Sequence, residues 1–209
     1  LLIGWRFGPA SLGFYKKAYD LFVLPTNQLS APLTSVAVSA LSRIADDGER
    51  YRRHFLNALS TLAFIGMGLG ACLTLAGGDA VLLLLGSQWK ESGRIFTFFG
   101  PGIGMMLLYG THGWIHLSIG RPDRWLGWGL VEITVTGLLF AVSLSWGPAG
   151  IAAAWVTSFW ILTIPALWYA GRPIRLEAAH VVRAVWRYVL ASAVAGVTVA
   201  VFLRAVGYS

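Results

Sequence analysis

Charged residues are scarce in this sequence: they make up 12% of its 209 residues, roughly half the share found in a typical soluble domain. Hydrophobic residues make up 56%, and the mean hydropathy is +0.67. A chain with so few charges lacks the side chains that a water-exposed surface needs. The composition therefore argues against a soluble domain and favours a protein that lies in a membrane.

Cysteine is almost absent as well: Cys72 is the single one, which excludes an internal disulfide. The sequence has no initiator methionine and no charged segment that leads to a cleavage site, so we expect no signal peptide. Leu1 to Phe7 resembles the end of a helix, and we expect a fragment of a longer protein. The net charge of +7 would suit nucleic acid, but the basic residues lie between apolar stretches, so we expect no nucleic-acid partner.

Long apolar stretches dominate what is present. A membrane-spanning helix needs about 20 mostly apolar residues, and we assign six such stretches: 18–41, 55–76, 95–119, 125–146, 151–170 and 181–206. The short turn "SWGPAG" between the fourth and the fifth predicts an antiparallel pair of helices. We therefore expect an all-α polytopic bundle of about six membrane helices, preceded by the end of another helix.

The basic residues predict an orientation. Ten of the sixteen lie in or next to the three connections that follow the first, third and fifth spans, and six lie at the opposite ends. Cytoplasmic loops carry an excess of Lys and Arg, so we place the larger group in the cytoplasm. We assign the following tryptophans to the aromatic belts at the membrane surfaces: Trp89, Trp114, Trp125, Trp128, Trp146 and Trp186.

The most charged of these connections lies in the stretch "LSRIADDGERYRRHFLNALS". We expect Gly48 to end one helix and Glu49 to begin the next, where an acid suits the positive end of the helix dipole. Arg52 and Arg53 then lie at the level of the lipid headgroups. They either belong to a solvated turn that only fixes the topology, or contact the phosphates of an anionic lipid substrate.

The first span carries more polar groups than a lipid-exposed helix tolerates, because Asp20, Asn27 and Gln28 all lie within it. Such a helix fits inside a bundle, where it lines a water-filled cavity. The alternative is an amphipathic helix that rests at the membrane surface.

Five phrases resemble one family when they are taken in order: "GPASLGFYKKAYDLFVLP", "APLTSVAVSALSRIADDGERYRRHFLNAL", "LLLLGSQWKES", "GWIHLSIGRPDRW" and "WGPAGIAAAWV". Together they cover roughly Leu1 to Arg172. Their order and spacing resemble the polysaccharide transporter (Wzx-like) flippases of the multidrug/oligosaccharidyl-lipid/polysaccharide exporter superfamily.

The resemblance implies two pseudo-symmetric lobes of helices around a central cavity. It also implies a function: moving undecaprenyl-pyrophosphate-linked oligosaccharides across the bacterial inner membrane by alternating access, for lipopolysaccharide or exopolysaccharide biosynthesis. Residues 1–209 would form most of the second, C-terminal lobe. Because one lobe only half encloses a cavity, we expect activity together with the missing N-terminal lobe, with membrane lipids and the polysaccharide polymerase machinery as further partners.

A flippase breaks no bond, so its candidate residues are polar groups along a path. Lys16, Lys17 and Arg94 are candidate cations for the pyrophosphate, and Asp20 lies one helical turn after Lys16. Asn27 and Gln28 are candidates to bind sugar hydroxyls. The alternatives are interfacial anchors for the lysines and helix–helix hydrogen bonds for the amides.

A second group of candidates lies in the third and fourth spans. His112 and His116 share one helical face, and Glu132 on the returning helix lies at a similar depth. These residues either form a proton relay or a salt-bridge latch, or are ordinary polar residues near a helix end. We expect no metal site, because the nearby ligands are few and scattered. Pro101 and Pro165 interrupt their spans and predict kinks.

Other functions compete with this interpretation. A multidrug or lipid II exporter of the same superfamily would share the topology, and a structural membrane subunit would lack the polar first span. A membrane-embedded glycan polymerase or ligase would need a large loop or an acid/base pair. The sequence has no paired carboxylates on one face, no GxSxG and no glycine-rich phosphate loop. We therefore expect a transporter that is not an enzyme and uses no cofactor.

Overall fold

The computed structural model describes the backbone of residues 2–206, and the side chains of these residues except 2, 25, 29 and 31. No strand lies in this range, so the expected all-α fold is confirmed. The α-helices, in chain order, are α1 (Leu2–Ser42), α2 (Gly48–Leu85), α3 (Lys90–Phe99), α4 (Ile103–Ser118), α5 (Pro122–Ser143), α6 (Gly147–Gly171) and α7 (Ala178–Ala205).

Helix α1 begins well before the predicted first span of 18–41. It contains one non-helical residue, Gly8, with φ 83° and ψ 171°, a backbone conformation that essentially only glycine adopts. Pro9 follows, and proline suits the first turn of a helix because its missing N–H would have no partner there. The predicted end of a preceding helix is therefore joined to the first span by a kink, with residues 9–17 helical.

Helix α2 extends the predicted span of 55–76 at both ends. Its N-cap is Asp47, whose side chain accepts a hydrogen bond of 3.0 Å from the Arg50 backbone N–H. The expectation that Gly48 ends the preceding helix is wrong, because α1 ends at Ser42 and Gly48 is the first residue of α2. Further along, Gly77 does not stop the helix, since it packs against the Phe96 ring on α3.

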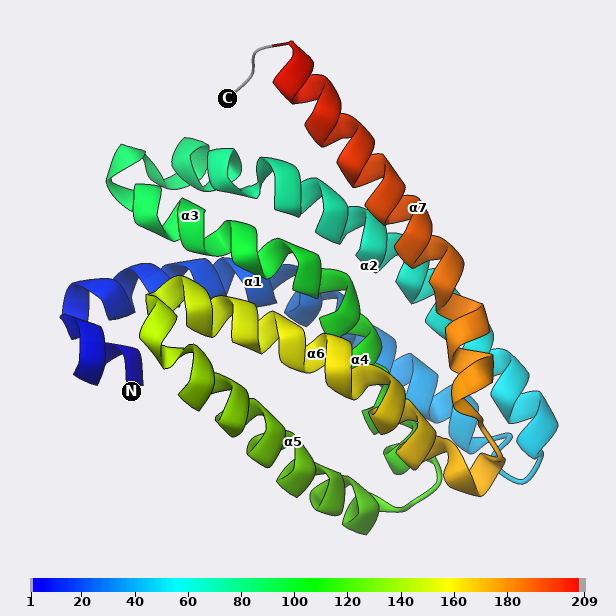
Figure 1. The fold of residues 1–209 in the computed structure, drawn as a ribbon. Helices are drawn as coiled ribbons and strands as arrows, with labels where there is room; N and C mark the ends of the chain where they lie inside the picture. Colours follow the sequence, from blue (N-terminus) through cyan, green and yellow to red (C-terminus); the bar gives the residue numbers. More distant parts are fainter. Residues whose placement is uncertain (1, 207–209) are drawn as a thin grey trace.

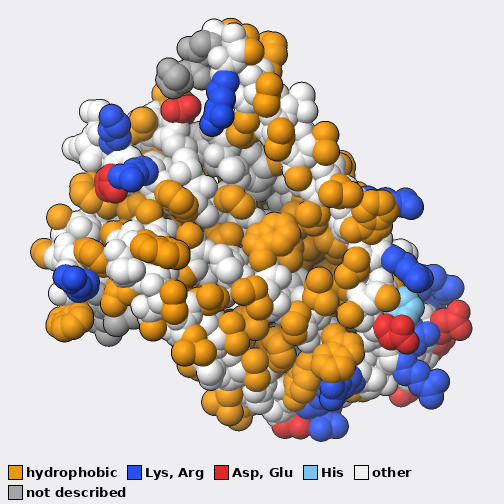
Figure 2. All heavy atoms as spheres, viewed as in Figure 1, with side chains coloured by type: hydrophobic (Ala, Val, Ile, Leu, Met, Phe, Trp, Pro, Cys, Tyr) orange, Lys and Arg blue, Asp and Glu red, His pale blue; other side chains and the backbone are white. Residues whose placement is uncertain are grey.

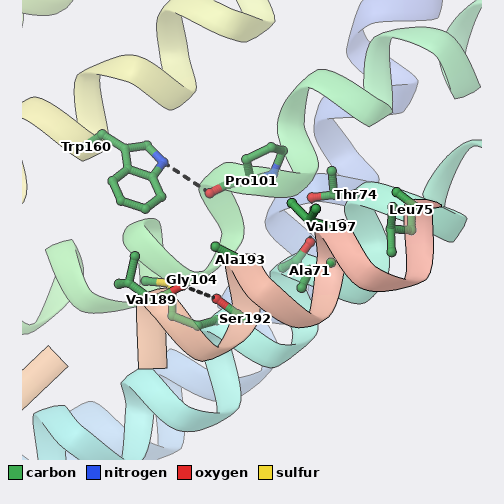
Figure 3. Close-up of a pocket in the computed structure, with 14 residues that line it drawn as sticks. Ala71, Thr74, Leu75, Pro101, Gly104, Trp160, Val189, Ser192, Ala193 and Val197 are labelled. Carbon is green, nitrogen blue, oxygen red and sulfur yellow. Dashed lines mark hydrogen bonds between the residues drawn. The ribbon is translucent and has the colours of Figure 1, made fainter. Parts of the chain in front are cut away.

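The predicted third span, 95–119, is broken in its middle. A short 3₁₀ turn, Gly100–Gly102, separates α3 from α4 and contains Pro101, as the predicted kink requires. The Pro101 carbonyl accepts a hydrogen bond of 3.2 Å from the indole N–H of Trp160 on α6, as Figure 3 shows. The kink predicted at Pro165 does not end its helix, because α6 continues from Gly147 to Gly171.

The helices form a bundle in which α4 and α6 lie between α5 on one side and α2 on the other, with α7 lying across α2 (Figure 1). The predicted antiparallel pair is α5 and α6; Gly147, at φ 75°, turns the chain between them. The α1–α2, α4–α5 and α6–α7 connections meet at one end, which we call the arginine-rich end. There the guanidinium of Arg52 donates a hydrogen bond of 2.9 Å to the Ile174 carbonyl.

Glycines allow α2 and α4 to pack closely. A Cβ atom on Gly104 would lie 2.9 Å from the backbone carbonyl carbon of Gly66, and one on Gly70 would lie 3.2 Å from the Gly100 oxygen. Small residues are favoured where membrane helices cross because they let the backbones approach. This contact places α4, with its two histidines, against the rest of the bundle.

Three stretches of the described chain are long and apolar enough to cross a membrane: Gly48–Leu85, Pro122–Ile174 and Ala178–Ala205. The second holds α5 and α6 as a hairpin, so these stretches account for four of the six predicted spans. The other two are α1, which carries polar residues throughout, and the span divided into α3 and α4. For these two, a membrane crossing stays a prediction.

The exposed surface agrees with a membrane location. Figure 2 shows apolar side chains over the middle of one face, with most Lys and Arg side chains toward its ends. On α5, the large exposed side chains are apolar, among them Leu126, Leu130 and Ile133.

Candidate functional site

A polar stripe runs along the exposed side of α1. The opposite side of the helix packs against α3, α4 and α6 through buried residues such as Ala18 and Phe22. The predicted path residues Asp20, Asn27 and Gln28 all face away from this packing. We call the following exposed residues the α1 stripe: Lys16, Asp20, Asn27, Gln28, Ser35, Ser39 and Arg43.

The two lysines at the start of the stripe are separated by the fold. Lys16 forms an ion pair of 2.7 Å with Asp20, and both side chains are at least half exposed. Lys17 instead lies over the Trp89 ring, 5.6 Å from its centroid, against the end of the bundle. Lys16 and Asp20 are therefore available to a ligand on the stripe, whereas Lys17 has the contact expected of an interfacial anchor.

The middle of the stripe offers free hydrogen-bonding groups. Asn27 and Gln28 are exposed, and none of the hydrogen bonds within the described part of the chain uses either amide. Each amide carries two donors and one acceptor oxygen, which is the combination that sugar hydroxyls need. The Ser39 and Arg43 side chains continue the stripe towards the arginine-rich end and line a shallow hollow there.

Arg94 lies near the other end of the bundle, on α3. Its nearest acid is Glu91, at 3.9 Å, and both side chains are largely exposed. Together with Asp79, Gln88 and Lys90 it lines an open hollow of about 640 Å³. Arg94 is therefore accessible to an anion from the side opposite the arginine-rich end, but it does not lie on the α1 stripe.

The two loop arginines differ in their contacts. Arg52 is partly buried and bonds the Ile174 carbonyl, so it ties the start of α2 to the α6–α7 connection. Arg53 is exposed. The prediction that these side chains contact lipid phosphate stays open for both, but Arg52 also has a structural contact that the sequence did not reveal.

The structure brings His112 and His116 together inside the bundle, and Glu132 lies partly buried on the neighbouring helix α5. The ring centroids of the two histidines are 5.9 Å apart, and that of Tyr109 lies 4.6 Å from that of His112. Sequence reasoning missed Tyr109 as a member of this cluster. It also placed Trp128 in the aromatic belt, whereas its indole is buried and donates a hydrogen bond of 2.9 Å to the Tyr109 hydroxyl.

Trp114 is a second correction to the predicted belt. Its side chain is buried between α4 and α1, and its indole N–H donates a hydrogen bond of 2.8 Å to the Thr34 hydroxyl. The spacing of polar and apolar residues could not reveal this, because it depends on which helix packs against α4.

A cavity beside the helix break is unsuited to a sugar. It has a volume of about 370 Å³ and lies between α2, α6 and α7, next to Pro101 (Figure 3). Its hydroxyls on Thr74 and Ser192 already donate to the carbonyls of Gly70 and Val189. Because the rest of its lining is mostly hydrocarbon, this cavity does not suit a polar ligand, and the α1 stripe is the more polar surface.

Comparison with known proteins finds similarity to polysaccharide biosynthesis proteins over parts of the chain. Residues 1–94, which include the α1 stripe, match the family model described as "Polysaccharide biosynthesis protein". The chain is 24% identical over 156 residues to the teichuronic acid biosynthesis protein TuaB of Bacillus subtilis, covering 75% of the chain and 32% of that protein. It is 29% identical over 91 residues to the lipopolysaccharide biosynthesis protein WzxC of Escherichia coli, covering 44% of the chain and 18% of WzxC.

Over these stretches the chain is similar to Wzx-like polysaccharide biosynthesis proteins. A membrane protein from the cps region of Klebsiella pneumoniae is also similar, with 32% identity over 82 residues that cover 39% of the chain and 17% of that protein. The chain spans about a third of TuaB and less than a fifth of the other two relatives. No solved structure matches it significantly.

The apolar helices and the similarity to a membrane protein support a multi-pass membrane protein, and the similarities as a group point to polysaccharide biosynthesis.

Proposed function

We propose that the protein containing this chain moves an undecaprenyl-pyrophosphate-linked oligosaccharide across the bacterial inner membrane by alternating access, and that the α1 stripe forms one wall of the path. The remainder of the protein, including an N-terminal lobe, supplies the opposite wall. The protein performs no covalent chemistry. Polysaccharide polymerase machinery then takes up the translocated glycan.

The observation that carries this proposal is the contrast between the exposed side of α1 and that of α5. The exposed side of α1 carries charges, amides and hydroxyls beside apolar side chains such as Leu24 and Val36, whereas the large exposed residues of α5 are apolar. Polar groups that face lipid are costly, and in membrane proteins they face a water-filled cavity or another part of the protein. A wet path along α1 accounts for the contrast.

The chemistry of the stripe suits the head group of the cargo. Lys16, beside Asp20, is a cation that can approach pyrophosphate without being buried, and Arg43 is a second one towards the arginine-rich end. Asn27 and Gln28, between them, bind sugar hydroxyls. The hydrocarbon tail stays in the bilayer, so the path needs no apolar enclosure.

The test is complementation by the full-length gene in a host that lacks its own flippase, with surface glycan as the readout. We expect the wild type to restore surface glycan and the double variant Asn27→Leu, Gln28→Leu to lose most of it at normal membrane abundance. Thr134→Val is the matched control, because it also removes an exposed polar group, but from α5. It should behave as the wild type.

Two outcomes would count against the proposal. If the double variant restores as much glycan as the wild type, the stripe is not part of the path. If the wild type restores none with several lipid-linked donors, the cargo is wrong, and a multidrug or lipid II exporter becomes the better account. Accumulation of a longer or ligated glycan inside the cell would instead indicate a polymerase or ligase.

A further inference from the structure

Two histidines on α4 are buried, and three of their four ring nitrogens lack a hydrogen-bond partner within the described residues. His116 has no exposed surface and His112 is 4% exposed. Within the described residues, neither nitrogen of His116 has a hydrogen-bond partner, and Nε2 of His112 has none. Buried polar atoms in folded proteins nearly always have a partner. The pair therefore needs an explanation beyond packing.

The contacts of His112 leave one nitrogen as a base. Its Nδ1 faces the Tyr109 carbonyl, which only accepts, so Nδ1 carries the proton and Nε2 carries the lone pair. The Tyr109 hydroxyl accepts a hydrogen bond from Trp128, and its own proton is free for another acceptor. Glu132 lies one helical turn after Trp128, on the same face of α5, which places it on the side of the pair where Trp128 meets Tyr109.

The surroundings of His116 differ from those of His112. Its ring lies parallel to Trp125, with centroids 6.4 Å apart, and 6.1 Å from the Tyr169 ring of α6. Arg124, whose guanidinium lies over the Tyr169 ring, is on this side of the pair, and Asp123 lies nearby.

The other helices that pack on α4 contribute no charge to the pair among the contacts described. Tyr51 on α2 bonds the Ser118 hydroxyl, and Thr34 on α1 accepts from Trp114. Glu132 therefore lies on the His112 side of the pair, and Arg124 lies on the His116 side.

We propose that His112 and Glu132 form a proton-binding site, and that His116 connects it to the arginine-rich end. The proton binds to Nε2 of His112, and the carboxylate of Glu132 balances the charge. His112 is eight residues before Gly120 in the α4–α5 turn, which places the site about 12 Å from that end. The inference rests on the proposed function, because a proton bound here would be coupled to movement of the lipid-linked oligosaccharide.

A metal ion is a poorer occupant of the site. No group of three or more His, Cys, Asp or Glu side chains in the described residues is placed to hold one. A proton needs only one lone pair and one balancing charge, which His112 and Glu132 supply.

The first measurement needs no glycan. The full-length protein is placed in proteoliposomes, and the fluorescence of Trp125 is obtained as the difference between wild type and Trp125→Phe. Trp125 suits this purpose because its ring lies 6.0 Å from His112 and 6.4 Å from His116. We expect its signal to change reversibly with pH, and to lose that response in His112→Asn and in Glu132→Gln.

The matched control is His54→Asn. His54 is exposed on α2, and its Nδ1 also faces a backbone carbonyl one turn earlier, that of Arg50, at 2.8 Å. The same substitution therefore removes an imidazole in a similar contact, away from the cluster, and should leave the Trp125 signal unchanged. If His112→Asn fails to fold, Glu132→Gln gives the answer by itself, because it keeps the size of the side chain. A pH response that persists in both variants overturns the proposal.

The second measurement adds the lipid-linked oligosaccharide and an imposed pH gradient. We expect transport by the wild type and by His54→Asn to follow the gradient, and transport by Glu132→Gln to lose this dependence. Wild-type transport that ignores the gradient overturns the coupling and leaves the proposed function standing. A pH-dependent Trp125 signal without any transport overturns the proposed function and leaves the proton site standing.

Discussion

The glycine contact between α2 and α4 gives a prediction that can be worked out from the structure. In Gly104→Ala, the new Cβ would lie 2.9 Å from both the carbonyl carbon and the oxygen of Gly66, and 2.9 Å from the sulfur of Met67. Real Cβ atoms essentially never approach other atoms so closely. Because two of the three atoms are backbone, the new methyl group can be accommodated only if α4 moves away from α2.

Gly110→Ala is the matched control on the same helix, because a Cβ there would have nothing within 4 Å. Both substitutions gain helix propensity, worth up to about 1 kcal/mol. Only Gly104→Ala also overpacks a contact, at a cost of about 1–3 kcal/mol. We therefore expect the unfolding free energies of the two variants to differ by about 1–3 kcal/mol, with Gly104→Ala the less stable, which is roughly a 5- to 150-fold change in the unfolding equilibrium.

The assay is unfolding of the full-length protein in mixed detergent micelles, followed by tryptophan fluorescence. Gly66→Ala tests the same contact from α2, and its effect should not add to that of Gly104→Ala, because residues in contact are coupled. If Gly104→Ala and Gly110→Ala agree to within about 0.5 kcal/mol, the limit of ordinary additivity, the close approach of α2 and α4 does not hold α4 in place.

Other contacts can be tested in the same way. Asp47→Ala removes the N-cap of α2 and should lower the unfolding free energy by about 1 kcal/mol, whereas Asp47→Ser should restore most of it. Arg52→Lys keeps the charge but loses the planar donor to the Ile174 carbonyl, and should cost about 1.5–3 kcal/mol in the same assay; no change would assign Arg52 to lipid phosphate alone. The wet path can be tested with single cysteines in protein that also carries Cys72→Ser. Ser39→Cys should react with a membrane-impermeant thiol reagent, whereas Thr134→Cys should not, because thiolates form in water rather than in lipid. Equal reactivity of the two cysteines would contradict the wet path.

Each of the six apolar stretches predicted from hydropathy is helical, but hydropathy did not predict where the helices end or that the third stretch is divided into α3 and α4. A window of apolar residues reports which stretches prefer lipid, whereas helix ends depend on local capping and on neighbouring helices. Asp47 begins α2 seven residues before the apolar part of that helix, through one side-chain hydrogen bond. At the other end, Gly77 stays helical because Phe96 packs against it, a contact between residues far apart in the sequence.

The cluster around His112, His116 and Glu132 could be predicted only in part, because the sequence relates positions along one helix but not the contacts between helices. Positions on one helix could be related by spacing, so His112 and His116 were placed on one face, and the depth of Glu132 could be estimated by counting residues from the turn. Which aromatic side chains enclose them could not be counted. Trp128 and Trp146 both lie near the ends of apolar stretches, but Trp128 is buried against Tyr109 and Trp146 is 72% exposed, because α4 packs beside only the first of them.

The direction in which α1 faces is the strongest link between this fold and transport. A helix with this many polar groups would most easily bury them against its own bundle, where the other helices could supply partners. Instead α1 buries Ala18 and Phe22 and leaves Asn27 and Gln28 outside. These groups avoid a large desolvation cost only in water or against polar groups of another part of the protein. The proposed path supplies both, because it sets the polar residues of α1 against water and the opposite lobe, while the large exposed side chains of α5, which are apolar, face lipid.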